Sequence, residues 1–181
     1  MRWRGNSYIR LLMTIGAIRI LGVDPGLRAT GWGVIEAVGS RLSFVGCGSI
    51  ETDSSASLAE RLAAIHRLLT GLIGREGPQE AAIEETFINR DPQSALKLGQ
   101  ARGAALAALA LTGLPVAEYA ANLIKKTVVG AGHAEKRQVA MMVKMLLPAS
   151  TAATPDAADA LAVAICHAQH RAARAIARSG P

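Results

Sequence analysis

Apolar runs broken by turn residues divide the first third of the chain into short extended segments. The run from Ile18 to Val23 is almost unbroken and stops at Asp24 and the turn signal Pro25-Gly26, which predicts a strand buried on both faces. Two further apolar runs follow after only a few residues each, at 31–35 and 42–50, with Gly39-Ser40 between them. Connections this short predict that the first three strands form an antiparallel meander.

Helical periodicity dominates the rest of the chain. Leucine and isoleucine recur at intervals of three and four from Leu58 to Leu72, which predicts an amphipathic helix that ends near Gly74. Thr154 followed by Pro155 marks the start of the last helix, because Thr caps a helix and Pro suits its first position. The remaining predicted elements are a strand at 80–84, a loop at 85–92, a helix at 93–111, a strand at 115–119, helices at 121–128 and 134–146, and the last helix from 154 towards 178. The pattern predicts an α/β fold with a five-stranded mixed sheet flanked by helices.

Composition narrows the class of protein. With 181 residues, half of them hydrophobic, the chain is long enough for one domain with a core of its own. A formal net charge of +6 favours a polyanionic partner, and nucleic acid is the leading candidate. Cys47 and Cys166 fit neither a metal-ligand spacing nor a disulfide framework, which indicates a reducing, cytoplasmic setting.

The first 17 residues differ from the rest of the chain. They carry Arg2, Arg4 and Arg10 around a short apolar patch and lack the longer apolar region of a secretory signal. We expect a disordered or mis-started extension over 1–17, with Met13 an equally good initiator, followed by a single domain over 18–178. The apolar segment 104–116 is shorter than the roughly 20 residues that span a bilayer, so no membrane span is expected.

Four acidic residues lie at ends of predicted strands and at a helix start, where a carboxylate needs hydrogen bonds, a cation or a metal as a partner. Asp24 ends the first strand and Glu84 ends the fourth, while Asp156 and Asp159 share one face of the first turn of the last helix. If the two strands are neighbours and the helix packs beside them, the four carboxylates converge at one edge of the sheet. Oxygen-only ligands suit Mg²⁺ or Mn²⁺, and two such ions about 4 Å apart can promote phosphodiester hydrolysis.

Each acid also has a simpler interpretation. Asp24 fits an ordinary cap of the Pro-Gly turn. Acids in a first helical turn stabilise the helix macrodipole by about 0.3 to 1 kcal/mol, which is reason enough for Asp156 and Asp159. The spacing alone leaves these alternatives open.

Five stretches together are more specific than any single motif. They are Leu21–Gly26 with Thr30–Gly33, Ala82–Glu84, Ser94–Gly103, Lys126–Gly130 and Asp156–Ala162. In register, from about Ile18 to His167, they resemble RuvC, the family of bacterial Holliday-junction resolvases. The resemblance implies that residues 18–178 form an RNase H-like nuclease domain and a homodimer that cleaves four-way DNA junctions in recombination and repair, leaving 5'-phosphate ends.

The same resemblance implies roles for single residues and for partners. It implies that the catalytic residues and metal ligands are Asp24, Glu84, Asp156 and Asp159, serving Mg²⁺, or Mn²⁺ in its place, with two ions in each active site. Glu85 is set aside, because alternation along a strand sends it to the opposite face from Glu84. The branch-migration proteins RuvA and RuvB are implied as partners by family alone.

Three residues are candidates for DNA binding. Phe87 follows Glu84 in a loop, where an aromatic ring can stack on an unpaired base, or else lie under its own loop. Lys125 and Lys136 flank the glycine hinge 130–132, and the resemblance implies that these two contact DNA phosphates. For the neighbouring Lys126 and Arg137 we expect solvated surface positions, and for His133 a phosphate contact and not a metal.

Two helix faces remain ambiguous. Small residues recur every four positions on the helix 93–111, at 95, 99, 103 and 107, and either the sheet or a partner helix could approach this stripe. On the last helix Arg171, Arg174 and Arg178 share a face, for which a solvated position is the default interpretation.

Two rival functions compete with a junction nuclease. An actin-like ATPase or sugar kinase also opens with a strand, an acid and phosphate-binding glycines, but it needs two such lobes, for which 181 residues leave no room. A catalytically silent junction-binding protein would not need all four acids.

Overall fold

A five-stranded mixed sheet forms the middle of the molecule. The computed structural model describes residues 16–85 and 91–178, with side chains as far as Arg171. The strands lie in the order β3-β2-β1-β4-β5, with β1 to β3 antiparallel and with β4 and β5 parallel to β1. Their bounds are β1 Ile18–Asp24, β2 Ala29–Val38, β3 Arg41–Glu51, β4 Glu80–Glu85 and β5 Val116–Ala120.

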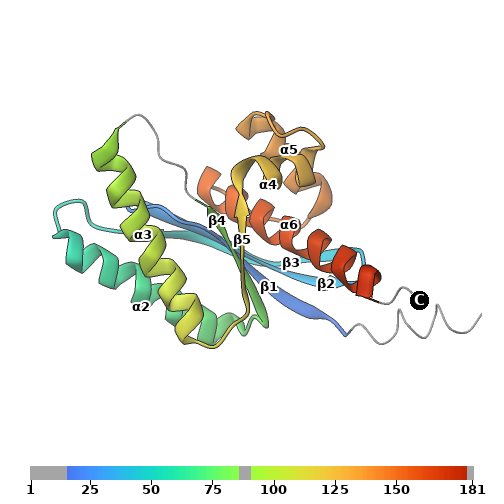
Figure 1. Cartoon of the computed structure of the whole chain (residues 1–181), viewed down its shortest axis with the longest axis horizontal. Helices are drawn as coiled ribbons and strands as arrows, with labels where there is room; N and C mark the ends of the chain where they lie inside the picture. The colour runs from blue at the N-terminus through green and yellow to red at the C-terminus, as the bar shows by residue number, and fades with distance from the viewer. Residues whose placement is uncertain (1–15, 86–90, 179–181) are drawn as a thin grey trace, which may run out of the picture.

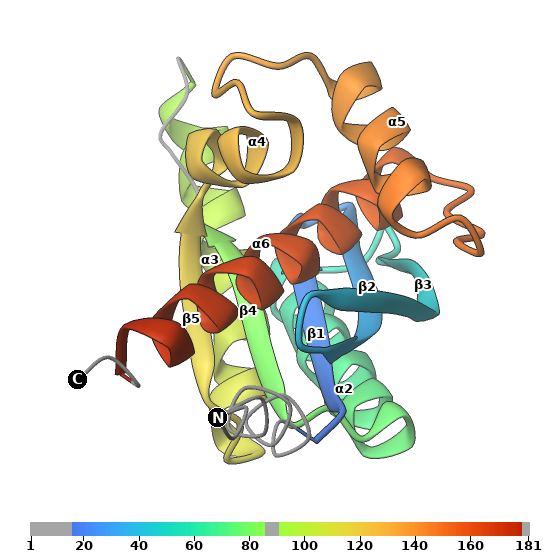
Figure 2. The ribbon, with the colours of Figure 1, turned by 90° about the vertical axis from the view of Figure 1, so that its right-hand side faces the viewer.

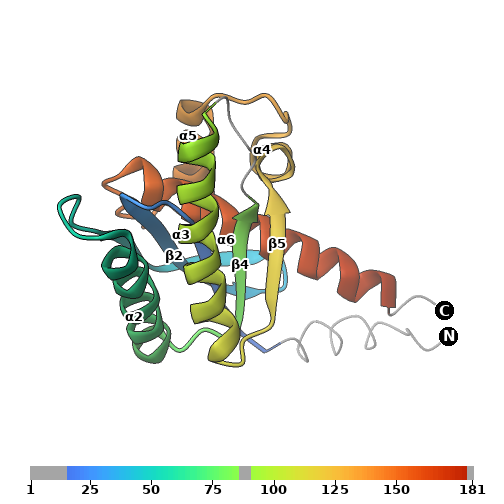
Figure 3. The same cartoon turned by 60° about the vertical axis from the view of Figure 1, so that its left-hand side comes forward.

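Helices cover both faces of this sheet. One face carries α2 Leu58–Glu76 and α3 Pro92–Leu111, which Figure 3 shows side by side in front of the strands. The other carries α4 Ala121–Val129, α5 Lys136–Leu146 and α6 Pro155–Arg178 (Figure 1). The predicted α/β class and mixed sheet are confirmed. None of the helices in the described ranges is long and apolar enough to cross a membrane.

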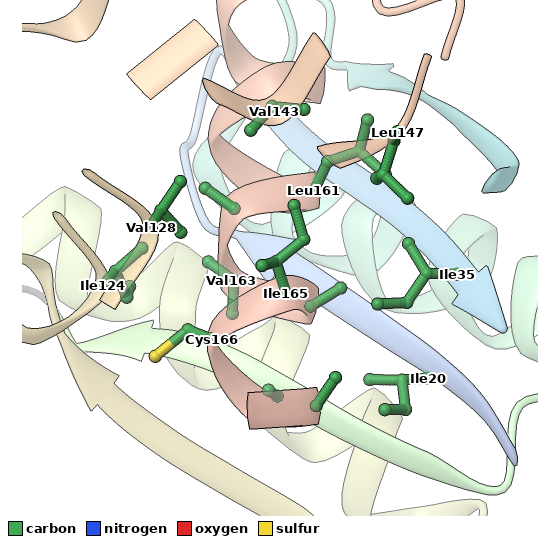
Figure 4. Close-up of a cluster of buried hydrophobic side chains, with 14 of the residues drawn as sticks. Ile20, Ile35, Ile124, Val128, Val143, Leu147, Leu161, Val163, Ile165 and Cys166 are labelled. Carbon is green, nitrogen blue, oxygen red and sulfur yellow. The ribbon is translucent and has the colours of Figure 1, made fainter. Parts of the chain in front are cut away.

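Two hydrophobic cores follow from alternation along the strands. Leu21 and Val23 of β1 point towards α2 and α3, whereas Ile18 and Ile20 point towards the other three helices. The second core is drawn in Figure 4, where side chains of α4, α5 and α6 meet Ile20 and Ile35 of the sheet. Asp24 continues the series 18, 20, 22, so it belongs to the face that α6 covers.

Helix α6 crosses the strands of the sheet (Figure 2), and its backbone lies very close to glycines of β1 and β2. A Cβ on Gly22 would overlap the backbone carbonyl of Ala160, and one on Gly31 would overlap that of Asp156. Glycine at these two positions therefore allows a close approach that any side chain would prevent. This packing brings the first turn of α6 down onto the sheet beside the end of β1.

The observed elements match the predicted ones to within a few residues, with one informative difference. The first helix was predicted to end near Gly74, but α2 continues to Glu76. Gly74 has open space around it and stays helical, whereas Gly77 takes the left-handed conformation (φ 59°) that ends the helix. The glycine with the special backbone conformation, and not the first glycine, stops the helix.

Candidate active site

The ends of β1 and β4 bring Asp24 and Glu84 to the same edge of the sheet. The two strands are parallel neighbours, and Val23 pairs with Ile83 in their register, so the next residue of each strand is one of the two acids. Alternation places both on the face covered by α6, because Gly22 and Ala82 precede them on that face. From the sequence, the acids are expected to meet if the two strands are neighbours, and β1 and β4 are neighbours.

The first turn of α6 supplies the other two acids. Thr154 caps the helix, since its hydroxyl accepts from the backbone N–H of Ala157 at 3.3 Å and its carbonyl from that of Ala158 at 3.2 Å. Asp156 and Asp159 follow, both half-buried, with the Asp156 backbone directly above Gly31. We call Asp24, Glu84, Asp156 and Asp159 the acidic cluster.

The carboxylates of the acidic cluster lie close enough to change one another's pKa. Burial raises the pKa of Asp24 to about 8, and the charges of Glu84, Asp159 and Asp156 add to the rise. Burial also raises the pKa of Glu84, and Asp159 is the next contributor. Carboxylates on three separate elements therefore sense one another, which a turn cap or a macrodipole would not require.

Two lysines oppose this accumulation of negative charge. Lys136, at the start of α5, places its Nζ 3.0 Å from Oδ2 of Asp159, and this hydrogen bond is the main cause that raises the pKa of Lys136. Its charge also lowers the pKa of Asp24 and Glu84. Lys125 of α4 is half-buried and lowers the pKa of Glu84. Both predicted DNA-binding lysines thus stand at the acidic cluster.

The donor chemistry of the cluster suits a hard divalent cation. It offers carboxylate oxygens alone, and the ionised form of Asp24 lacks enough neighbouring positive charge to hold its pKa in the ordinary range. Within 16–85 and 91–178, no three His, Cys, Asp or Glu side chains already form a coordination shell. Asp24, Glu84, Asp156 and Asp159 are the residues that would hold such a cation.

Comparison with known proteins decides the family. The family model for the crossover junction endodeoxyribonuclease RuvC matches residues 20–167. The chain belongs to the RuvC family. RuvC of Methylocella silvestris is 70% identical over 92% of this chain and 95% of its own length, and that of Xanthobacter autotrophicus is 64% identical over 92% and 99%.

A solved RuvC structure agrees with the fold. The RuvC of T. thermophilus, in complex with a Holliday junction substrate, superposes with a TM-score of 0.79 at 34% identity, covering 87% of this chain and 96% of that one. The expected RNase H-like nuclease fold is thereby confirmed for the described part of the chain.

The structure places the other candidate residues of the sequence analysis in different surroundings. Phe87 lies outside the described residues. Lys126, Arg137 and His133 are exposed. The default interpretation of Arg171 was wrong, because its Nε donates to Oε1 of Glu80 at 2.9 Å and the side chain is partly buried. Arg174 and Arg178 lie beyond the described side chains.

Sequence reasoning missed two residues that support the site. Thr30 is fully buried, and its hydroxyl donates to the Gly26 carbonyl at 2.7 Å, which fixes the turn directly after Asp24. Arg102 of α3 donates from Nε to the Glu84 carbonyl at 3.0 Å and also pairs with Glu118. Both lie in the stretches that carried the resemblance, but only the fold reveals what they contact.

Proposed function

We propose that this RuvC chain resolves four-way DNA junctions by metal-dependent hydrolysis at the acidic cluster. The observation that supports this most directly is the convergence of Asp24, Glu84, Asp156 and Asp159 from two strands and one helix, with the pKa of Asp24 raised to about 8. A solved relative, the T. thermophilus RuvC, is in complex with a Holliday junction substrate. Family and site therefore favour the same reaction.

The four carboxylates would hold Mg²⁺, or Mn²⁺ in its place, with two ions in each site. Bound ions supply an activated water and stabilise the leaving oxygen of the phosphodiester. The chain itself contributes charge and position: α6 is held against β1 by close contacts at Gly22 and Gly31, so the carboxylates of strand and helix stay together. Lys136 offsets part of the negative charge of the cluster through its contact with Asp159.

Lys125, Lys136 and Phe87 would contact the DNA. The two lysines lie beside the acids, where a phosphate backbone must pass to reach them, and the net charge of +6 favours the association. Phe87 lies outside the described residues, and its role is proposed from the sequence alone, because an aromatic ring three residues after Glu84 suits stacking on an unpaired base.

A homodimer suits a junction with approximate two-fold symmetry, since each subunit can act on one of two opposed strands. The stripe on α3 supports this: Gly99, Gly103 and Ala107 are exposed, and the buried face of the helix is formed instead by Ala101, Ala105, Ala108 and Leu109. Leu96 and Leu111 are 65% and 78% exposed on the same helix. We propose that α3 meets α3 of a second copy, and that the enzyme acts in the cytoplasm together with RuvA and RuvB.

One cleavage experiment tests the proposal. A synthetic four-way junction and a linear duplex of the same sequence are incubated with the protein in Mg²⁺ or in EDTA. We expect paired nicks on opposed strands of the junction in Mg²⁺ alone, and no cleavage by Asp24→Asn, which should still shift the junction in a gel without metal. A wild-type protein that binds the junction but never cuts it would favour the catalytically silent alternative.

A further inference from the structure

A second polar contact joins α6 to the sheet, at the opposite end of β4 from the acidic cluster. Nε2 of His167 lies 2.8 Å from Oε2 of Glu80, and Arg171 donates to the other carboxylate oxygen at 2.9 Å. Nδ1 of His167 lies 2.9 Å from the hydroxyl of Tyr119 on β5. His167 is only 6% exposed and Tyr119 4%. None of these residues takes part in the proposed hydrolysis.

The spacing of these contacts matches the spacing of the acids. Glu80 and Glu84 lie on one face of β4, four residues apart, which is about 13 Å along a strand. Asp159 and His167 lie eight residues apart on α6, which is about 12 Å along a helix. His167 at Glu80 and Asp159 near Glu84 are thus two points at which α6 meets β4, and Asp159 is the neighbouring charge that raises the pKa of Glu84 most.

Apolar packing also joins the described part of α6 to the sheet. Ala160, Ala164 and Leu161 pack on the glycines of β1 and β2, which sets how closely the helix approaches. This packing depends on position, because only glycine leaves room for the α6 backbone at those places. Hydrogen bonds to the half-buried carboxylate of Glu80 are directional, so they add a restraint on how far α6 lies along β4.

We propose that Glu80, His167 and Tyr119 form a clamp that positions α6, so that Asp156 and Asp159 lie at the ends of β1 and β4. The proposal rests on the proposed function, because it assigns positioning residues to that site. The clamp also reaches α4: the ring of His170 stacks on Tyr119 with centroids 5.5 Å apart, and its Nε2 lies 3.2 Å from the Thr127 hydroxyl. Lys125 lies on α4 as well, so the same contacts connect it to α6.

The test compares variants of the clamp with a core variant on the other side of the sheet. His167→Leu keeps the bulk of the ring and removes both polar contacts, whereas His167→Gln keeps a donor for Glu80. Leu72→Ala, at a buried position of α2 in the core on the other face of the sheet, is the control for lost stability alone. For each full-length protein we would measure the melting temperature, junction Kd in EDTA, kcat at saturating junction, and Mn²⁺ affinity by calorimetry without DNA.

We expect His167→Leu to bind the junction in EDTA like the wild type but to lose about tenfold in Mn²⁺ affinity and tenfold or more in kcat. His167→Gln should recover most of both, and Leu72→Ala should lower the melting temperature alone. If His167→Leu only lowers the melting temperature, or if Gln is no better than Leu, the clamp is a structural contact and the proposal is overturned. Glu80→Gln carries the same test should His167→Leu not fold.

The result for Asp24→Asn separates this inference from the proposed function. Normal Mn²⁺ binding and cleavage by Asp24→Asn would refute the acidic cluster as the active site, whatever the clamp variants do. If Asp24→Asn loses cleavage while His167→Leu keeps normal Mn²⁺ affinity and kcat, the clamp is refuted and the acidic cluster remains the proposed active site.

Discussion

Replacing Asp24 by Asn should stabilise the protein while it abolishes cleavage. Burial and three neighbouring carboxylates raise the pKa of Asp24 from 3.8 to about 8. Between these two values the folded protein keeps a proton that the unfolded chain has already lost. The contribution of Asp24 to stability is therefore fully present below pH 4 and is lost as the pH rises to about 8.

The size of the effect follows from that interval. Four pH units at about 1.4 kcal/mol each give an upper limit of about 6 kcal/mol, and water and side-chain rearrangement reduce the cost of a partly buried charge below this limit. Asn carries no charge at any of these pH values and avoids the cost. In EDTA the advantage of Asp24→Asn over the wild type should be near zero at pH 4 and reach several kcal/mol at pH 9.

Urea unfolding followed by circular dichroism measures this directly. Both proteins are unfolded in EDTA at unit intervals from pH 4 to pH 9, so that the titrations they share cancel in the difference. Adding Mg²⁺ at pH 8 should stabilise the wild type and leave the variant nearly unchanged, because binding to the folded state alone raises stability. A difference that does not vary with pH, or a wild type that is the more stable protein at pH 9 in EDTA, would refute the reasoning.

Two further predictions concern DNA and the dimer. Lys125→Ala and Lys136→Ala should each reduce the slope of log Kd against log salt by about 0.9. Lys126→Ala, on the exposed side of α4, should leave the slope unchanged. If Lys125→Ala and Lys136→Ala also keep the wild-type slope, these two lysines do not contact a phosphate. Gly103→Glu should sediment as a monomer at concentrations where the wild type is a dimer. Gly74→Glu, at an exposed helical glycine of α2, should not change the mass, and a dimeric Gly103→Glu would refute the α3 interface.

Local sequence signals predicted the separate parts of the acidic cluster, but they did not predict that these parts come together. Apolar runs that stop at Asp24 and Glu84 reveal two strand ends, and Thr154-Pro155 reveals the start of α6. Their convergence depends on β1 and β4 being neighbours, a pairing between segments about 60 residues apart. Hydrophobic periodicity describes each segment separately and carries no information about such pairing, so only the resemblance to RuvC could supply it.

The small-residue stripe on α3 shows another limit of pattern reasoning. The helix carries alanine or glycine on both sides, so its buried face (Ala101, Ala105, Ala108) and its exposed face (Gly99, Gly103, Ala107) look alike in sequence. Periodicity shows that faces exist, and it cannot choose between them when both are small and apolar. The Glu80 contact with His167 was missed for a different reason, since its partners lie 87 residues apart.

The acidic cluster explains why the fold is built so firmly around α6. Four carboxylates that lie close together repel each other, and this repulsion adds to the burial that raises the pKa of Asp24. Something must hold the helix in place against it. The glycine contacts at Gly22 and Gly31 fix the distance of α6 from the sheet, Lys136 offsets part of the charge, and the Glu80 clamp adds a restraint on the position along β4. Because these restraints act in different directions, weakening any one of them should change metal binding before it unfolds the protein, and that order of events distinguishes a preorganised site from an ordinary core.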